Sequence, residues 1–344
     1  AANALLRGRA EQAARILSAA ADSFAALDPS EPARRRIDYG NQMFKHGWRY
    51  GGPGLALAAE MYRAAGDALA RTEQWDAWAR AQGSLGNTLQ DQGIRTGGAE
   101  GTALLAQAVD SYDAALKVLS RTAHPVDWAK TQINLGNALQ EQSKRAGGAE
   151  GAALLAQAVD AYNAALEVLT REAHPMDWAA TQNNLGNTLQ AQGIRTGGSE
   201  GAALLARAVD AYRAALEVRT RAAHPVGWAQ TQNNLGNALQ AQGTRTGGAE
   251  GAALLARAID AFSKALEVLT REDHPAQWAT TRENMARVHT AIADLGATID
   301  PAGHLRAALG HVEAALTVFD PEHMAFNHHK ATALRDHLCA RLGL

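Results

Sequence analysis

Asparagines recur inside sequence that otherwise favours helix, and they are the residues best suited to binding chemistry. The stretch TQNNLGNTLQAQGIRTGGSE, from Thr181 to Glu200, returns almost unchanged from Thr231 to Glu250. Asparagine is a mediocre helix former, because its side chain competes for backbone hydrogen bonds. An amide also offers N–H donors and a carbonyl acceptor, which suits it to bind the backbone of an extended peptide. The recurrence therefore needs a reason other than helix propensity.

The asparagines share one helix face, away from the apolar one. At about 100° per residue, Asn184 and Asn187 lie roughly 100° or more from the apolar stripe that contains Trp178 and Leu185. In stacked copies they would form a ladder along a polar strip. The candidate peptide-binding residues are the ladder asparagines and two variable residues of the same strip: Asn87, Asn134, Asn137, Asn184, Asn187, Asn234, Asn237, Asn284, Lys130 and Gln230.

A structural role for the asparagines is the alternative. In that case Asn184 hydrogen-bonds to the neighbouring unit and fixes the stacking. The position that varies most along the strip is predicted to set specificity rather than to support the scaffold. Its occupants are Lys130, Ala180, Gln230 and Thr280.

The histidines do not indicate a metal centre. One histidine per unit precedes a proline: His124, His174, His224 and His274. Ligand atoms lie ~2 Å from a metal ion, whereas packed helices lie roughly 8–10 Å apart, so equivalent histidines of successive units cannot share an ion. They are interpreted as N-cap or turn residues. A second group, near the C-terminus, has no His-x3-His pair: His304, His311, His323, His328, His329 and His337. We predict no metal and no cofactor.

The glycine-rich loops, such as RTGGAEG, are interpreted as connectors. A phosphate-binding P-loop needs a strand before it and Lys-Ser/Thr after it, and both are missing here. One arginine per loop is predicted to pair with the glutamate that follows it or to face solvent. These arginines are Arg95, Arg145, Arg195 and Arg245, and the glutamates are Glu100, Glu150, Glu200 and Glu250.

No pattern typical of catalysis is present. Cys339, the single cysteine, has no recognisable catalytic partner, and there is no paired-carboxylate or zinc signature. An active site also needs unlike residues that converge, whereas this chain repeats like residues. We therefore predict that the protein is not an enzyme.

Two helices per unit must position these residues. Tryptophans recur every fifty residues at Trp128, Trp178 and Trp228, and they are expected to be largely buried. Pro175 suits the first turn of a helix that ends near GIRTGG, where glycines tolerate a left-handed cap. A second helix follows in GAALLARAVDAYRAALEV. No alternating strand pattern appears, so the predicted fold class is all-α.

The motif Ala158-x3-Tyr162-x2-Ala165, followed by Leu185-Gly186, resembles the tetratricopeptide repeat. That family has a period of about 34 residues, and the fifty-residue period here resembles the extended tetratricopeptide-like repeats of some bacterial proteins. The resemblance implies a right-handed superhelical α-solenoid of helix-turn-helix repeats. It also implies that asparagines flanking Leu-Gly line a concave surface that captures peptides.

The repeats predict three regions. A capping helix is expected over 1–27, about six repeats over 28–320, and a second capping helix over 321–344. The fifty-residue period is clearest over 75–274. A weaker copy, YGNQMFKHGWRYGG, begins at Tyr39 and matches the repeat at Gly-Asn and at Arg-x-Gly-Gly.

Composition narrows the partners. Of 344 residues, 33 are Lys or Arg and 35 are Asp or Glu, so the net charge of -2 does not favour nucleic acid or an acidic membrane surface. No apolar run approaches the ~20 residues of a membrane helix, and one cysteine fits the cytoplasm. We predict a scaffold or adaptor for a protein or peptide ligand. The alternatives are an RNA-binding helical repeat, disfavoured by charge and by the constant ladder, and a self-associating structural solenoid, which leaves homo-oligomers open.

Overall fold

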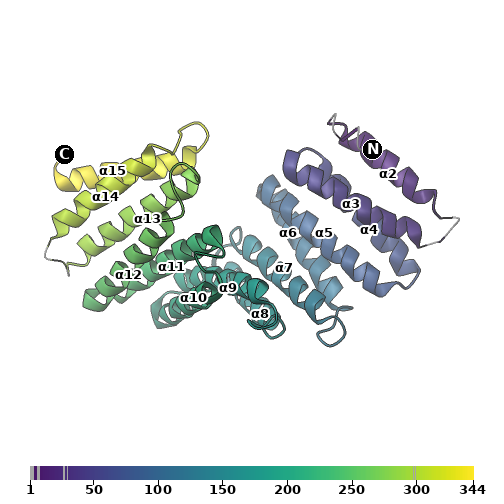
Figure 1. The fold of residues 1–344 in the computed structure, drawn as a ribbon, viewed down its shortest axis with the longest axis horizontal. Coiled ribbons are helices and arrows are strands. Elements are labelled where there is room, and N and C mark those ends of the chain that lie inside the picture. The colour runs from purple at the N-terminus through teal and green to yellow at the C-terminus, as the bar shows by residue number, and fades with distance from the viewer. Residues whose placement is uncertain (1–3, 6–7, 26–27, 29, 297, 299) are drawn as a thin grey trace. The chain divides into compact units, whose positions relative to one another are not determined.

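The protein consists of helices connected by short turns (Figure 1). The computed structural model describes residues 4, 5, 8–25, 28, 30–296, 298 and 300–344. These residues form fourteen helices, α2 to α15, and no strand. The prediction of an all-α fold of tandem helical repeats is confirmed. The chain divides into two compact units, residues 1–169 and 170–344, which are described separately below.

The first unit alternates two kinds of helix. A helices carry the Gly-Asn pair, and the B helix that follows each one carries a large aromatic ring. The helices are α2 (Ala10–Asp22), α3 (Glu31–Tyr50), α4 (Gly54–Arg71), α5 (Trp75–Thr96), α6 (Gly98–Leu116), α7 (Pro125–Ser143) and α8 (Gly148–Leu166). The A helices are α3, α5 and α7. Each packs against its own B helix, and α5 and α7 also pack against the B helix before them. Helix α2 lies within 1–27, the region of the predicted capping helix, of which 1–3, 6–7 and 26–27 lie outside the described residues.

The second unit continues the alternation. Its helices are α9 (Pro175–Thr196), α10 (Gly198–Val218), α11 (Pro225–Thr246), α12 (Gly248–Leu266), α13 (Pro275–Asp294), α14 (Pro301–Leu316) and α15 (Ala325–Leu342). The A helices are α9, α11 and α13, and α15 occupies the next A position. As predicted, α9 begins at Pro175. Gly197 and Gly198 follow it with φ of 70° and 53°, a backbone region that favours glycine.

The glycine of the Leu-Gly pair is required by a close approach between helices. A Cβ placed on Gly186 would lie 2.7 Å from the ring of Tyr212, and one on Gly136 would lie 2.8 Å from the ring of Tyr162. Both tyrosines are fully buried. The ring of each B helix therefore lies directly on the backbone of its A helix.

The last complete repeat preserves this contact with different residues. Ala286 and Val312 stand fifty residues after Gly236 and Phe262, and both are fully buried. A methyl group is gained on the A helix and an aromatic ring is lost from the B helix. The smaller side chain of Val312 thus leaves room for the methyl group of Ala286.

The tryptophans Trp128, Trp178 and Trp228 are partly buried. Trp128 packs against the fully buried Ala129, Ala165 and Leu169, but it is itself only partly buried. Trp228 does the same one hundred residues later. Because alanines and a leucine fill the space between the helices, the indole covers the edge of the core rather than its centre.

The loop arginines connect successive repeats, which corrects the prediction that they pair with glutamates or face solvent. In the first unit Arg145 Nη2 donates to the carbonyl oxygen of Gly93 at 2.7 Å. In the second unit Arg245 Nη1 donates to the carbonyl oxygen of Gly193 at 2.7 Å. The carbonyl oxygens of Gly93 and Gly193 also accept from the cap N–H groups of Gly97 and Gly197, each at 3.4 Å, so the guanidinium of the next repeat adds a second, shorter hydrogen bond at the helix end. Arg95 donates in the same way to Trp48 O, also at 2.7 Å.

Two glycine substitutions test the close approach. Gly186→Ala should lower the free energy of unfolding by about 1–3 kcal/mol, because the new methyl group overlaps the Tyr212 ring. Gly83→Ala is the matched control, since Gly83 also lies inside a helix but has open space around its Cβ position. It should raise stability by about 0.5–1 kcal/mol through helix propensity. Urea midpoints measure both, and equal shifts would contradict the packing described.

Candidate functional site

The predicted binding residues lie on the A helices, and we call the face of each A helix that carries them the A-helix strip. In the first unit they are Asn87 on α5, and Lys130, Asn134 and Asn137 on α7. In the second unit they are Asn184 and Asn187 on α9, Gln230, Asn234 and Asn237 on α11, and Asn284 on α13. Asn87, Lys130 and Gln230 are exposed and the others are half-buried. All of them are therefore at least partly accessible to solvent.

The asparagine after Leu-Gly accepts a hydrogen bond from the buried tyrosine. Tyr212 Oη donates to Asn187 Oδ1 at 2.7 Å. The same bond, also at 2.7 Å, joins Tyr112 to Asn87 and Tyr162 to Asn137. Burial raises the pKa of Tyr212, so the hydroxyl stays protonated and donating. This half of the ladder therefore has a structural role, whatever else it binds.

Asn237 is the natural exception to this pairing. The ring that lies on Gly236 is Phe262, which has no hydroxyl. The repeat packs in the same way without the bond, and the phenylalanine is fully buried. Asn237 thus occupies the ladder position without the tyrosine contact.

Amides of neighbouring A helices also bind one another. Asn234 Nδ2 on α11 donates to Asn183 Oδ1 on α9 at 3.2 Å. Fifty residues later, Thr281 Oγ1 on α13 donates to Asn233 Oδ1 on α11 at 3.1 Å. The structural alternative therefore holds for Asn234, which connects two successive repeats of the second unit.

These bonds do not use every donor and acceptor of the Asn187 and Asn234 amides. An asparagine side chain has two N–H donors and a carbonyl with two lone pairs. The bond from Tyr212 uses one lone pair of Asn187, and the bond to Asn183 uses one donor of Asn234. The remaining donors and acceptors have the chemistry that hydrogen-bonding to a peptide backbone requires.

A cavity opens beside the strip in the second unit. It has a volume of about 230 Å³ and lies where α11 and α13 meet the start of α15. Gln230, Asn234 and Thr280 supply polar groups, while Leu269 and Met324 supply apolar surface. Two predicted binding residues and one predicted specificity position thus line the same cavity. It has room for an uncharged side chain.

Three residues of this arrangement escaped the sequence analysis. Asn183 and Asn233 lie one position before the predicted ladder, and Asn41 on α3 accepts from Tyr62 at 2.6 Å. The Gly-Asn match in the copy that begins at Tyr39 was the available signal for Asn41. For Asn183 and Asn233, the amide itself was visible, but its direction toward the next A helix was not.

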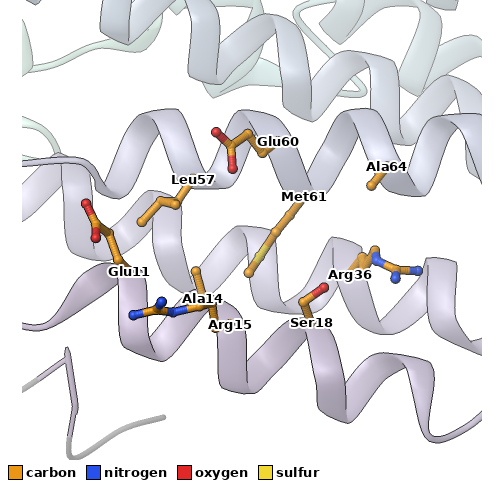
Figure 2. Close-up of a pocket in the computed structure, with 9 residues that line it drawn as sticks. All are labelled: Glu11, Ala14, Arg15, Ser18, Arg36, Leu57, Glu60, Met61 and Ala64. Carbon is orange, nitrogen blue, oxygen red and sulfur yellow. The ribbon is translucent and has the colours of Figure 1, made fainter.

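Another cavity, of about 390 Å³, lies away from the strip (Figure 2). Figure 2 shows Leu57 and Met61 reaching from α4 toward α2. Acidic and basic side chains both line this cavity, among them Glu60 and Arg15. The lining therefore favours neither an anionic nor a cationic ligand, and it includes none of the predicted binding residues.

The proline-preceding histidines occupy N-cap positions, as predicted, at His124, His174, His224 and His274. Near the C-terminus, His304 and His311 of α14 meet His289 of α13. His289 Nδ1 and His304 Nδ1 lie 2.9 Å apart, and His289 stacks on His311 with ring centroids 5.5 Å apart. No group of three metal-ligating side chains suited to an ion occurs among the described residues.

This histidine cluster replaces an apolar contact. Fifty residues earlier, the three positions hold Leu239, Leu254 and Ala261. Burial lowers the pKa of His289, and the nearby His304 lowers it further. Burial, with Arg282 and His289 alongside, lowers the pKa of His311 to about 4. His289 and His311 are therefore neutral in the folded protein near pH 7.

Comparison with known proteins identifies the fold but no family. No protein-family model and no curated protein matches the sequence. Among solved structures, the chain is similar to BtubC (BKLC) from P. vanneervenii, with a TM-score of 0.52 and 19% identity. That similarity covers 76% of this chain and 91% of BtubC.

Weaker similarities involve other repeat and adaptor proteins. One is a putative kinesin light chain from Podospora anserina with nearly identical TPR-like repeats (TM-score 0.42, 22% identity, 69% of this chain and 97% of that chain). Another is Nro1, described as a nuclear import adaptor (TM-score 0.47, 8% identity, 94% of this chain and 99% of that chain). No described helix is long and apolar enough to cross a membrane.

The tyrosine–asparagine bond can be measured with a double-mutant cycle. Tyr212→Phe and Asn187→Ala should each lower the free energy of unfolding, and the pair should show a coupling of about 0.5–1.5 kcal/mol. Asn237→Ala is the control, because Phe262 gives it no bond to lose. Urea unfolding of the four proteins gives the coupling, and a coupling near zero would contradict the bond.

The histidine cluster predicts loss of stability in acid. The folded pKa values of His289 and His311 lie below the unfolded value of about 6.5. The unfolded chain therefore binds more protons below that pH, and stability should fall as the pH drops from about 6.5 toward 4. Allowing for the solvent-screened part of the rings, we expect a loss of about 1–2 kcal/mol.

Restoring the residues of the preceding repeat provides the control for this pH effect. The triple variant His289→Leu, His304→Leu and His311→Ala should remove most of the difference between melting temperatures at pH 7.5 and 5.0. An unchanged difference would place the acid sensitivity elsewhere. Added Zn²⁺ should leave the melting temperature of the native chain unchanged.

Proposed function

We propose that the protein is a cytoplasmic scaffold or adaptor that binds an extended peptide segment of a protein partner through the A-helix strip. It acts by binding rather than by catalysis, and its units are an extended form of the tetratricopeptide repeat. The observation that carries the proposal is the cavity between α11 and α13, which lies beside the ladder and is lined by Gln230, Asn234 and Thr280.

Amides and a cavity together suit an extended peptide. A peptide in this conformation presents N–H and C=O groups at regular intervals, which amides can bind whatever the peptide sequence. Its side chains project alternately, so a cavity beside the amides can select one of them. In the second unit Asn184, Asn187 and Asn234 bind the peptide backbone, and the cavity lined by Leu269 selects a side chain.

Two observations disfavour the alternatives. RNA binding needs cations for the phosphates, whereas the variable strip position of the second unit holds the uncharged Ala180, Gln230 and Thr280. End-to-end association needs a terminal surface that resembles the repeat interface. In α15, however, Arg335 and Asp336 stand where α11 has Leu-Gly, as expected of a polar terminal cap.

Selection from a library tests the proposal. Random peptides of about ten residues, displayed on phage, are selected against the full chain, and an enriched peptide is synthesised for calorimetry. The variant Asn184→Ala, Asn187→Ala, Asn234→Ala and Asn237→Ala should bind it about thirtyfold more weakly or worse, because each hydrogen bond contributes about 0.5–1.5 kcal/mol.

A second variant avoids the asparagines that hold the fold together. Gln230→Ala with Asn237→Ala removes two strip amides without breaking a tyrosine bond, and should weaken binding about tenfold. The control, Gln157→Ala with Asn163→Ala, removes two exposed amides of α8 and should leave the affinity unchanged.

Two outcomes would overturn the proposal. One is equal affinity in the strip and control variants, which would place the binding surface elsewhere. The other is the absence of any enriched peptide combined with salt-sensitive binding of single-stranded RNA, which would favour the RNA alternative.

A further inference from the structure

One copy of the repeat has an arginine where three others have a buried leucine and the last has the buried Phe319. Leu119, Leu169 and Leu269 stand at equivalent positions after the B helix and are 3%, 0% and 1% exposed. In the copy between them, Arg219 occupies this position and is half-buried. Because the two fifty-residue units from 151 to 250 differ at few positions, this exchange stands out from a nearly constant background.

The arginine lies against the start of α11. Arg219 Nη1 donates to Thr231 Oγ1 at 3.2 Å. Its Cδ lies 3.8 Å from where a Cβ of Gly227 would be. Gly227 is itself an exchange, since the two preceding copies have Asp127 and Asp177, while the next copy has Gln277. Relative to the two preceding copies, this copy therefore gained a guanidinium and lost a carboxylate.

Among the described residues, Arg219 forms no ion pair with a carboxylate. Burial lowers the pKa of Arg219, as expected for a charge without a counter-ion. The guanidinium carries five N–H donors, and the bond to Thr231 accounts for one of them. Arg221, two residues later, differs because it is exposed and forms an ion pair with Glu267.

The repeat places this guanidinium beside the A-helix strip. Fifty residues later, Leu269 lines the cavity between α11 and α13 together with Gln230 and Asn234. Arg219 occupies the equivalent position between α9 and α11, and its partner Thr231 directly follows Gln230 in the sequence. The two successive junctions of the strip thus differ in chemistry. The α9–α11 junction has a cation, and the α11–α13 junction has a cavity with an apolar base.

We propose that Arg219 binds a carboxylate side chain of the bound peptide at the α9–α11 junction, while the α11–α13 cavity accepts an uncharged side chain of the same peptide. The inference rests on the proposed function and specifies its ligand. Neighbouring helices lie roughly 8–10 Å apart, and an extended peptide advances about 3.3 Å per residue. Because the side chains of an extended peptide alternate between two faces, the acidic and uncharged side chains should be two or four residues apart.

The same peptide library tests this specificity with three proteins. Peptides selected by the native chain should share an Asp or Glu, with an uncharged side chain two or four residues away. Arg219→Leu should lose the acidic preference. Leu269→Arg, which copies the exchange into the next repeat, should add a preference for a second acidic residue two or four positions from the first.

Calorimetry with one selected peptide gives the magnitude. Arg219→Leu should weaken binding of the acidic peptide about tenfold or more, because charge-assisted hydrogen bonds are the strong ones. It should leave unchanged the affinity for the same peptide with glutamine in place of glutamate. The variant should fold, since leucine stands at three equivalent positions. Arg221→Leu is the control and should change neither affinity.

The outcomes separate this inference from the proposed function. Enriched peptides without a shared acidic residue, or an acidic preference that survives Arg219→Leu, would overturn the role of Arg219 and leave peptide binding intact. No enriched peptide at all would overturn both. Single-stranded RNA that binds the native chain but not Arg219→Leu would also overturn the inference, because it would assign the cation to phosphate.

Discussion

The contact between a tyrosine ring and the bare backbone of the neighbouring helix supports the rest of the structure. Because Gly186 has no side chain, the ring of Tyr212 reaches across the interface and its hydroxyl arrives at the opposite face of the A helix. There it meets Asn187, a residue of the predicted binding surface. A single side chain therefore links the hydrophobic core to the polar strip, and the spacing between the two helices sets where the strip amide lies.

Stacking between repeats relies on a different kind of contact. The buried surface between repeats is mostly alanine and leucine, which pack well but specify register weakly. Directional bonds add the register: the carbonyl of Gly193 accepts from Arg245, and Asn183 accepts from Asn234. Exposed ion pairs such as Arg221 with Glu267 add little, because water and salt screen them. The strip amides thus serve the stacking as well as any ligand.

The repetition of the sequence allowed the fold to be predicted. The site was harder to predict, because contacts between side chains of different helices do not follow from the sequence of either helix. The period, the helix start at Pro175 and the glycines at the turns follow from local rules and were predicted correctly. The bond from Tyr212 to Asn187 was not predicted, because angular position on one helix does not show how far a side chain from another helix reaches. The loop arginines were misassigned for a similar reason. Their partner is a backbone carbonyl of the preceding repeat. Because every residue has such a carbonyl, the residue types do not indicate which one accepts the bond.

The use of a backbone carbonyl as the acceptor of these arginines affects how the number of repeats can change during evolution. Arg145 binds a main-chain oxygen of Gly93, and Arg245 binds one of Gly193, so each contact depends on an atom that every unit possesses. Unequal recombination between copies can then delete or duplicate fifty codons, and each new neighbour finds the acceptor it needs. After Arg245 the pattern changes, because Leu295 stands at the equivalent position of the next repeat. Chain length in such a protein can therefore evolve separately from the stability of its junctions, and the number of units becomes a variable on which selection for ligand length can act.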